Sequence, residues 1–140
     1  MIVNLNSKVF LEAEWAGVVR MRERMKFLVT ATFAGGAFTA PALANVIYNL
    51  PLLLAFDVLK QVLIQARDER QFTCSRNQLG SLMDSSKVAL PWIDWDILRG
   101  GVKRRNEIAH DGKLFESTEC LQDIANVEAQ LIAWNVIAAT

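Results

Sequence analysis

Hydrophobic residues recur at spacings of three and four along most of the chain, which is the spacing of one face of an α-helix. This pattern predicts helical segments that run from residue 7 to about 34, from 40 or 49 to about 67, from 75 to about 85, from 94 to 111, and from 117 onward. The last segment carries an apolar stripe of Leu121, Ile124, Val127, Leu131, Trp134 and Ile137. No strand pairs or repeats are evident, so residues 1–140 predict one all-α domain, a four- to five-helix up-and-down bundle.

Short polar residues and glycines indicate where these helices begin and end. The predicted N-caps are Ser7, Asp94 and Ser117, because a short side-chain oxygen can accept a hydrogen bond from a free N–H of the first turn. Gly35-Gly36 and Asp111-Gly112 are predicted to end the first and fourth helices, because glycine readily adopts the left-handed conformation of a C-terminal cap.

Two stretches leave alternatives open. The second helix begins either with Thr39 as its cap and Pro41 in its first turn, or with Asn49 as its cap and Pro51 in its first turn. Gly100-Gly101 lies inside the fourth helical segment, where each glycine costs roughly 1 kcal/mol relative to alanine. The glycine pair either breaks the helix or marks a place where another backbone or a ligand comes close.

The stretch Phe27–Phe56 contains no charged residue and is long enough for a membrane span, which needs roughly 20 residues. It follows a basic run and contains Ala42-Leu43-Ala44, so it also imitates a signal peptide with its cleavage site. However, the stretch begins well inside the chain, and polar residues, glycines and prolines interrupt it. We therefore expect the end of one core helix, a turn and the start of another, with no membrane contact; a membrane-associated or exported protein is the alternative.

Composition narrows the class of protein. Fifteen basic and fifteen acidic residues cancel, so any site for an anion must be local. The hydrophobic fraction of 52% is slightly above average, which indicates burial beyond one core, most simply at a subunit interface. Cys74 and Cys120 show no metal-ligand or disulfide spacing, so we expect reduced thiols in a cytoplasmic protein. With one histidine in the chain, no metal or other cofactor is expected.

Candidate chemistry is concentrated in Lys103–Gly112, which contains the only histidine, His110, close to three cationic side chains. Histidine ordinarily titrates near neutrality and can give or take a proton, and an arginine can hold a phosphate through two parallel hydrogen bonds. The combination is suited to binding or cleaving a phosphodiester. The same run of basic residues, histidine and Asp-Gly is also typical of an ordinary helix terminus.

The helical positions of these residues place several of them beside a buried stripe. At ~100° per residue, the buried arc is predicted to contain Leu98, Val102 and Ala109. Arg105 and Asn106 flank this arc on opposite sides, where a groove or an interface would begin. Lys103 and His110 share the face of Asn106, whereas Arg104 is predicted to point toward solvent.

The run Arg105-Asn106-Glu107-Ile108-Ala109-His110 has the form R-N-x-x-A-H and resembles the R-x(4–6)-H motif of HEPN domains. These small helical bundles are named for higher eukaryotes and prokaryotes nucleotide binding. The resemblance covers about ten residues and the order of the helices. It implies metal-independent RNA cleavage in which Arg105 polarises the scissile phosphate, His110 transfers a proton, and Asn106 orients the phosphate or the imidazole. Lys103 and Arg104 would add positive charge for substrate binding.

The resemblance also implies partners. HEPN domains commonly act as homodimers that bring two motifs together, which meets a chemical need: attack by a 2′-hydroxyl requires both an acid and a base, and one chain has one histidine. Many prokaryotic members are toxins or phage-defence effectors, often encoded beside a nucleotidyltransferase-type antitoxin. Other members do not cleave RNA, so a helical module that binds a nucleotide or a partner protein is the alternative function.

Overall fold

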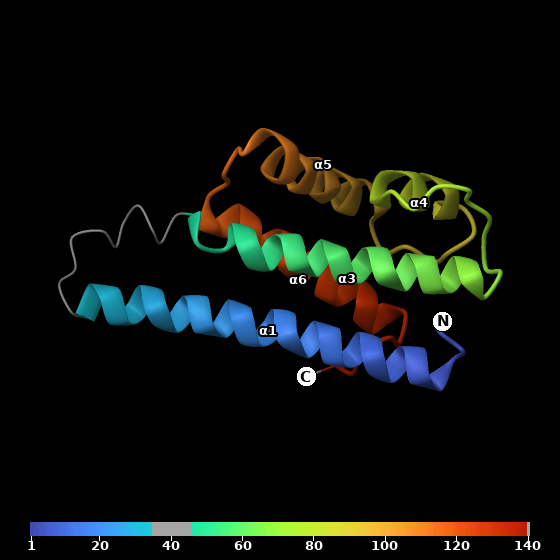
Figure 1. Cartoon of the computed structure of the whole chain (residues 1–140), viewed down its shortest axis with the longest axis horizontal. Helices are drawn as coiled ribbons and strands as arrows, with labels where there is room; N and C mark the ends of the chain where they lie inside the picture. The colour runs from blue at the N-terminus through green and yellow to red at the C-terminus, as the bar shows by residue number, and fades with distance from the viewer. Residues whose placement is uncertain (35–45, 140) are drawn as a thin grey trace.

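The computed structural model of this protein describes residues 1–34 and 46–139. Within them are five α-helices and no strand: α1 (Leu5–Ala34), α3 (Asn49–Asp68), α4 (Leu79–Ser86), α5 (Trp95–Asp111) and α6 (Ser117–Ala133). The four long helices α1, α3, α5 and α6 alternate in direction along the chain (Figure 1). The predicted all-α bundle is therefore confirmed for the part of the chain that is described.

Helix α3 is the centre of the bundle. It packs against each of the other four helices, with α1 on one side and α4 and α5 on the other (Figure 1). Its completely buried side chains are Leu52, Ala55, Phe56, Leu59, Val62, Leu63 and Ala66. Complete burial of a leucine, valine or phenylalanine side chain contributes about 1.5–3 kcal/mol, so this helix supplies much of the stabilising apolar contact.

The high hydrophobicity of α3 has a packing explanation. Among the described helices, α3 alone is long and apolar enough to cross a membrane by length and composition, and 56% of it is buried inside the bundle. A central core helix has this composition because it is covered on several sides. The uncharged stretch Phe27–Phe56 ends within α3, and its residues 35–45 lie outside the described residues, as do Gly35-Gly36 and the Thr39–Pro41 alternative.

Two of the three predicted N-caps are wrong. The first helix begins at Leu5, and the side chain of Asn4 accepts a hydrogen bond from the N–H of Ser7 at 3.0 Å, so Asn4 takes the role predicted for Ser7. In α6 the N-cap position is Glu116, which makes no side-chain cap bond, and Ser117 is the first helical residue. Asp94 is confirmed as a cap, because its carboxylate accepts from the N–H of Ile97 at 3.1 Å.

The second helix has Pro51 in its first turn, as the later of the two predicted starts requires, but Asn49 is not its cap. Asn49 is the first helical residue, and it is buried, with only 4% of its surface exposed. The Asn49 amide donates to the carbonyl of Phe115 at 2.9 Å and accepts from the N–H of Phe115 at 3.0 Å. This residue therefore joins the start of α3 to the connection between α5 and α6.

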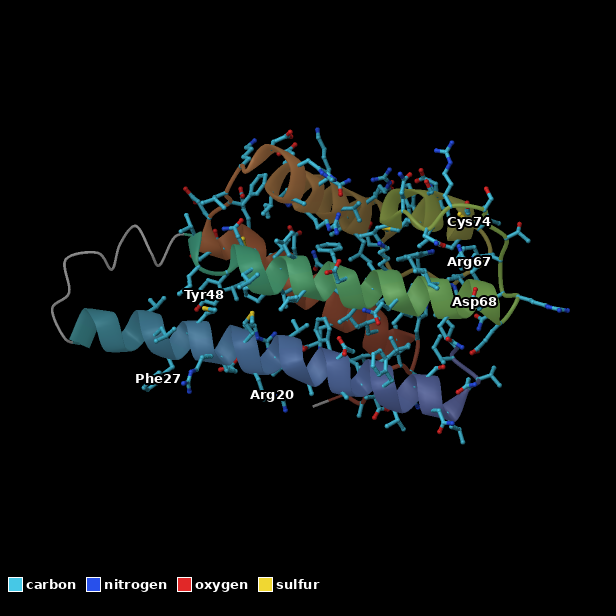
Figure 2. All side chains as sticks on the ribbon, viewed as in Figure 1. Arg20, Phe27, Tyr48, Arg67, Asp68 and Cys74 are labelled. Atoms are coloured by element: carbon cyan, nitrogen blue, oxygen red, sulfur yellow. The ribbon has the colours of Figure 1, made fainter. Side chains whose placement is uncertain are left out.

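The predicted helix start at Ser75 is wrong, because α4 begins four residues later at Leu79. The guanidinium of Arg67, at the end of α3, donates to the carbonyls of Cys74 at 3.4 Å and Arg76 at 3.0 Å. It also donates to the side chain of Asn77 at 2.7 Å. Figure 2 shows Arg67 and Cys74 together at this end of the bundle. These bonds occupy the backbone carbonyls of the segment and hold it in a loop.

The apolar stripe predicted for the last helix is mostly confirmed. Ile124, Val127 and Leu131 are completely buried, and Trp134 and Ile137 remain buried although they follow the end of α6. Leu121 was predicted to share the stripe but is 36% exposed. Its neighbour Cys120 is completely buried instead, so the buried face of α6 is turned toward position 120 and Leu121 lies at the edge of that face.

Gly100-Gly101 does not break α5, which runs unbroken from Trp95 to Asp111. A Cβ atom at position 101 would lie 2.6 Å from Cζ of Phe56 and 3.3 Å from Oδ1 of Asp123. The glycine therefore lets α5 approach α3 and α6 more closely than any other residue would allow. Position 100 is open, because the nearest atoms to a Cβ there are the Arg104 guanidinium nitrogens at 4.0 Å.

We predict that Gly101→Ala lowers the free energy of unfolding by about 1–3 kcal/mol, because the new methyl group overlaps the Phe56 ring in a filled core. The measurement is urea denaturation followed by circular dichroism. The matched control is Gly100→Ala, which gains helix propensity of up to ~1 kcal/mol without a clash. Equal stability of the two variants would contradict the close packing of α5.

Candidate functional site

Helix α5 carries all five residues predicted for the site, and local interactions define both of its ends. Asp94 caps its first turn, and Gly112 ends it in the left-handed conformation with φ of 66°. The Gly112 N–H donates to the carbonyl of Glu107. At the start of the helix, the indole of Trp95 donates to the carbonyl of Met83 at 3.0 Å, which joins α5 to α4. The predicted end of the helix at Asp111-Gly112 is confirmed.

Arg105 is held between its own helix and α3. One guanidinium nitrogen donates to Oδ1 of Asn106 at 3.2 Å, and another forms an ion pair with Oδ1 of Asp57 at 3.3 Å. The Arg105 side chain is 21% exposed. Its Nε is buried and has no hydrogen-bond partner in the described part of the chain. The guanidinium is therefore oriented, and it retains one donor that no protein group satisfies.

A groove of about 490 Å³ lies where α3, α4 and α5 meet. Arg105, Asn106 and His110 line it together, opposite the first turn of α4. His110 is exposed, and its imidazole makes no hydrogen bond or ion pair to other described residues. The complete lining is Lys60, Gln78, Leu79, Gly80, Ser81, Asp84, Arg99, Arg105, Asn106 and His110. The three residues predicted for catalysis thus share one concave site.

The outer face of α5 carries Lys103. A shallow depression of about 650 Å³ runs along this face, lined by residues of α5 itself. Lys103, Asn106 and His110 line it together, which confirms that these three side chains share one face of the helix. Arg99, Asn106 and His110 line both hollows. Ala109 was predicted to be buried, but it is exposed and Ile108 is buried in its place.

Arg104 does not point freely into solvent as predicted. Its guanidinium donates two hydrogen bonds to the carboxylate of Asp123 on α6, both at 2.7 Å, and the Asp123 side chain is 3% exposed. This hydrogen-bonded contact raises the pKa of Arg104. Arg104 therefore pairs with a buried charge on the α6 side of α5 and does not line the groove. Of the other four predicted site residues, Arg105, Asn106 and His110 line the groove, and Lys103 lies on the outer face of α5.

Sequence reasoning missed four charged residues at this site. Asp57 and Lys60 come from α3, Asp84 comes from α4, and Arg99 lies one turn and a half before Arg105 on α5. Arg99 Nε pairs with Oδ1 of Asp84 at 3.1 Å. A signal for the α3 pair was present in the sequence, because Asp57 and Lys60 are polar positions three residues apart on an otherwise apolar helix. That spacing did not indicate that α5 packs beside these two residues.

Neither cysteine belongs to the groove, and both thiols are free. Cys120 lies on the buried face of α6, where burial and the neighbouring Asp123 raise the pKa of its thiol to about 12. Because the thiolate is the reactive form, this thiol is inert at neutral pH. Within the described residues, no group of three or more His, Cys, Asp or Glu side chains is arranged to hold a metal ion.

No family model, curated protein or solved structure matches this chain. Its function must therefore be argued from the groove and the residues that line it.

We predict that Arg104→Met lowers the free energy of unfolding by about 1–3 kcal/mol, because it leaves the buried Asp123 carboxylate without its two-bond partner. The loss is limited because the Arg104 side chain is 34% exposed and partly screened by water. Chemical denaturation measures the loss. The matched control is the adjacent and exposed Lys103→Met, which should change stability by no more than about 0.5 kcal/mol. Equal losses in the two variants would refute the structural role of Arg104.

Proposed function

We propose that this protein is a metal-independent endoribonuclease of the HEPN type that acts as a homodimer in the cytoplasm. The observation that carries the proposal is the meeting of Arg105, Asn106 and His110 in one groove, with the arginine hydrogen-bonded to the amide. An oriented guanidinium beside an exposed imidazole supplies the two things that phosphodiester cleavage needs, charge stabilisation and proton transfer.

Each residue has a proposed role that follows from its present contacts. Arg105 binds the scissile phosphate through two parallel hydrogen bonds and neutralises the charge that grows on its oxygens, exchanging Asp57 for the phosphate. The Asn106 oxygen already accepts from Arg105, so its NH₂ group remains to donate to a phosphate oxygen. His110 takes the proton of the attacking 2′-hydroxyl or returns one to the leaving 5′-oxygen. The products are a 2′,3′-cyclic phosphate and a free 5′-hydroxyl.

The second acid–base group comes from a partner subunit in this proposal. Each chain has one histidine, whereas attack by the 2′-hydroxyl and departure of the 5′-oxygen call for a base and an acid. A two-fold axis would bring His110 of a second copy to the same cleft, because both subunits offer the same surface. In a toxin–antitoxin or phage-defence setting, the partner that restrains such a chain would be a nucleotidyltransferase-type antitoxin.

We predict that His110→Ala and Arg105→Ala each lower the rate of RNA cleavage at least ~100-fold, the usual range for loss of a proton-transfer group or an oriented charge. Asn106→Ala should have a smaller effect in the same direction. The assay follows cleavage of a labelled single-stranded RNA and identifies the cyclic phosphate at the new 3′ end.

Cleavage should persist in EDTA, since no metal takes part in the proposed reaction. The control variant is Arg20→Ala, because Figure 2 shows Arg20 on α1, on the side of the bundle away from α5. EDTA-sensitive cutting, or equal cutting by the His110 and Arg20 variants, would rule the nuclease out.

We also predict that cleavage depends on association of two subunits. Specific activity should fall when the protein is diluted below its dimer dissociation constant, and sedimentation should show the monomer appearing over the same concentration range. Full specific activity in a purely monomeric sample would disprove the shared cleft.

One observation favours the second candidate, a non-catalytic module that binds a nucleotide or a partner protein. Asp57 already neutralises Arg105, and the imidazole of His110 makes no hydrogen bond or ion pair to other described residues that would orient it. Binding of a phosphate requires only the Arg105 guanidinium and no proton transfer by His110. Tight nucleotide binding by a protein that cuts no RNA at any concentration would decide for this function.

A further inference from the structure

The groove contains two cations that the proposed chemistry leaves unused, Lys60 of α3 and Arg99 of α5. Lys60 is half-buried, and its ammonium forms no ion pair with other described residues. Arg99 is held by Asp84 at 3.1 Å. Both line the same hollow as Arg105, and they come from two different helices, so tertiary packing has gathered three cations at one site.

The position of Arg99 depends on a glycine. A Cβ atom at Gly80 would lie 3.0 Å from Nη2 of Arg99 and 3.4 Å from its Cζ. A glycine inside the short helix α4 lowers helix stability relative to alanine, yet here it lets the guanidinium lie close against the first turn of α4. This contact and the Asp84 ion pair hold Arg99 at the groove.

The charges of the groove favour an anionic ligand with more than one phosphate. Lys60, Arg99 and Arg105 face two carboxylates, Asp57 and Asp84, which leaves a positive surplus in a chain with no net charge. The two carboxylates are 49% and 57% exposed, so water screens their ion pairs. A phosphate can therefore replace either carboxylate, and the two arginines can bind two phosphates at once.

We propose that Lys60 and Arg99 form a second phosphate subsite, which holds the phosphate next to the one bound by Arg105. The ligand is then a single strand of RNA with consecutive phosphates, and a mononucleotide fills half of the site. A volume of about 490 Å³ between three helices lies in the range of small-molecule pockets, which suits a short stretch of one strand. This proposal rests on the nuclease function proposed above, because it takes the Arg105 subsite as the position of the scissile phosphate.

The test measures binding separately from cleavage. The probe is a short fluorescein-labelled oligouridylate with 2′-O-methyl groups, which lacks the attacking hydroxyl and so remains intact. Fluorescence anisotropy at several salt concentrations gives both the affinity and its salt dependence. Lys60→Gln and Arg99→Gln should each weaken binding of the probe roughly tenfold, and each should reduce the slope of log K against log salt by about 0.7. Uridine monophosphate should bind these variants within about twofold of the wild type.

Three further variants make the result specific. Asp84→Asn removes the competing carboxylate and should strengthen probe binding about threefold, the opposite direction to Arg99→Gln. Arg99→Lys keeps the charge and should keep the salt slope of the wild type, which separates loss of charge from loss of folding. Arg20→Gln, on the far side of the bundle, should leave affinity and slope unchanged (Figure 2).

The outcomes separate this proposal from the nuclease itself. If Lys60→Gln and Arg99→Gln both bind the probe with wild-type affinity and salt slope, the second subsite is overturned, whether or not these variants cleave RNA. Equal weakening of monophosphate and oligonucleotide binding would overturn it as well, because one phosphate would then account for the whole site. If the probe binds with the expected dependence but wild-type protein leaves unmodified RNA uncut, the subsite stands and the nuclease function fails.

Discussion

The pairing of α5 with α3 at the groove depends on the close packing of Gly101 of α5 against the Phe56 ring of α3. Because position 101 has no side chain, α5 lies near enough to α3 for Arg105, four residues later, to reach Asp57, the residue after Phe56. The same approach brings α5 against Asp123 of α6. A larger residue at position 101 would move the helix outward and separate both contacts. The site is thus built on a packing constraint in the core.

Two kinds of arginine–carboxylate pair result from this arrangement, and burial distinguishes them. Asp123 is almost completely buried, so its two bonds to Arg104 hold α5 and α6 together and cannot be exchanged without a large cost. Asp57 and Asp84 are about half exposed, so their pairs with Arg105 and Arg99 are weak and can be replaced by a phosphate. Neighbouring arginines on one helix therefore serve different purposes, because one pairs with a buried carboxylate and the others pair with exposed ones.

The proposed function depends on this convergence of side chains and not on overall likeness to known proteins. A short motif of arginine, asparagine and histidine is common by chance, but here its three residues line one groove with Arg99 of the same helix and Lys60 of a second helix. In the proposed function, the motif supplies the chemistry and the surrounding cations supply the affinity. The single histidine leaves the acid–base requirement of that proposal half met within one chain, which is why the proposal includes a homodimer.

The sequence by itself determined the helices, because their spacing of apolar residues and their local signals act within a few residues. It correctly gave the cap at Asp94, the end of α5 at Gly112, and the shared face of Lys103, Asn106 and His110. Only the tertiary structure decided which charged side chains meet. The start of α4, the engagement of Arg104 and the cations around the groove depend on partners from other helices, where burial sets the strength of each contact. Such pairs join residues that are far apart in the chain, so they produce no regular spacing in the sequence from which they could be predicted.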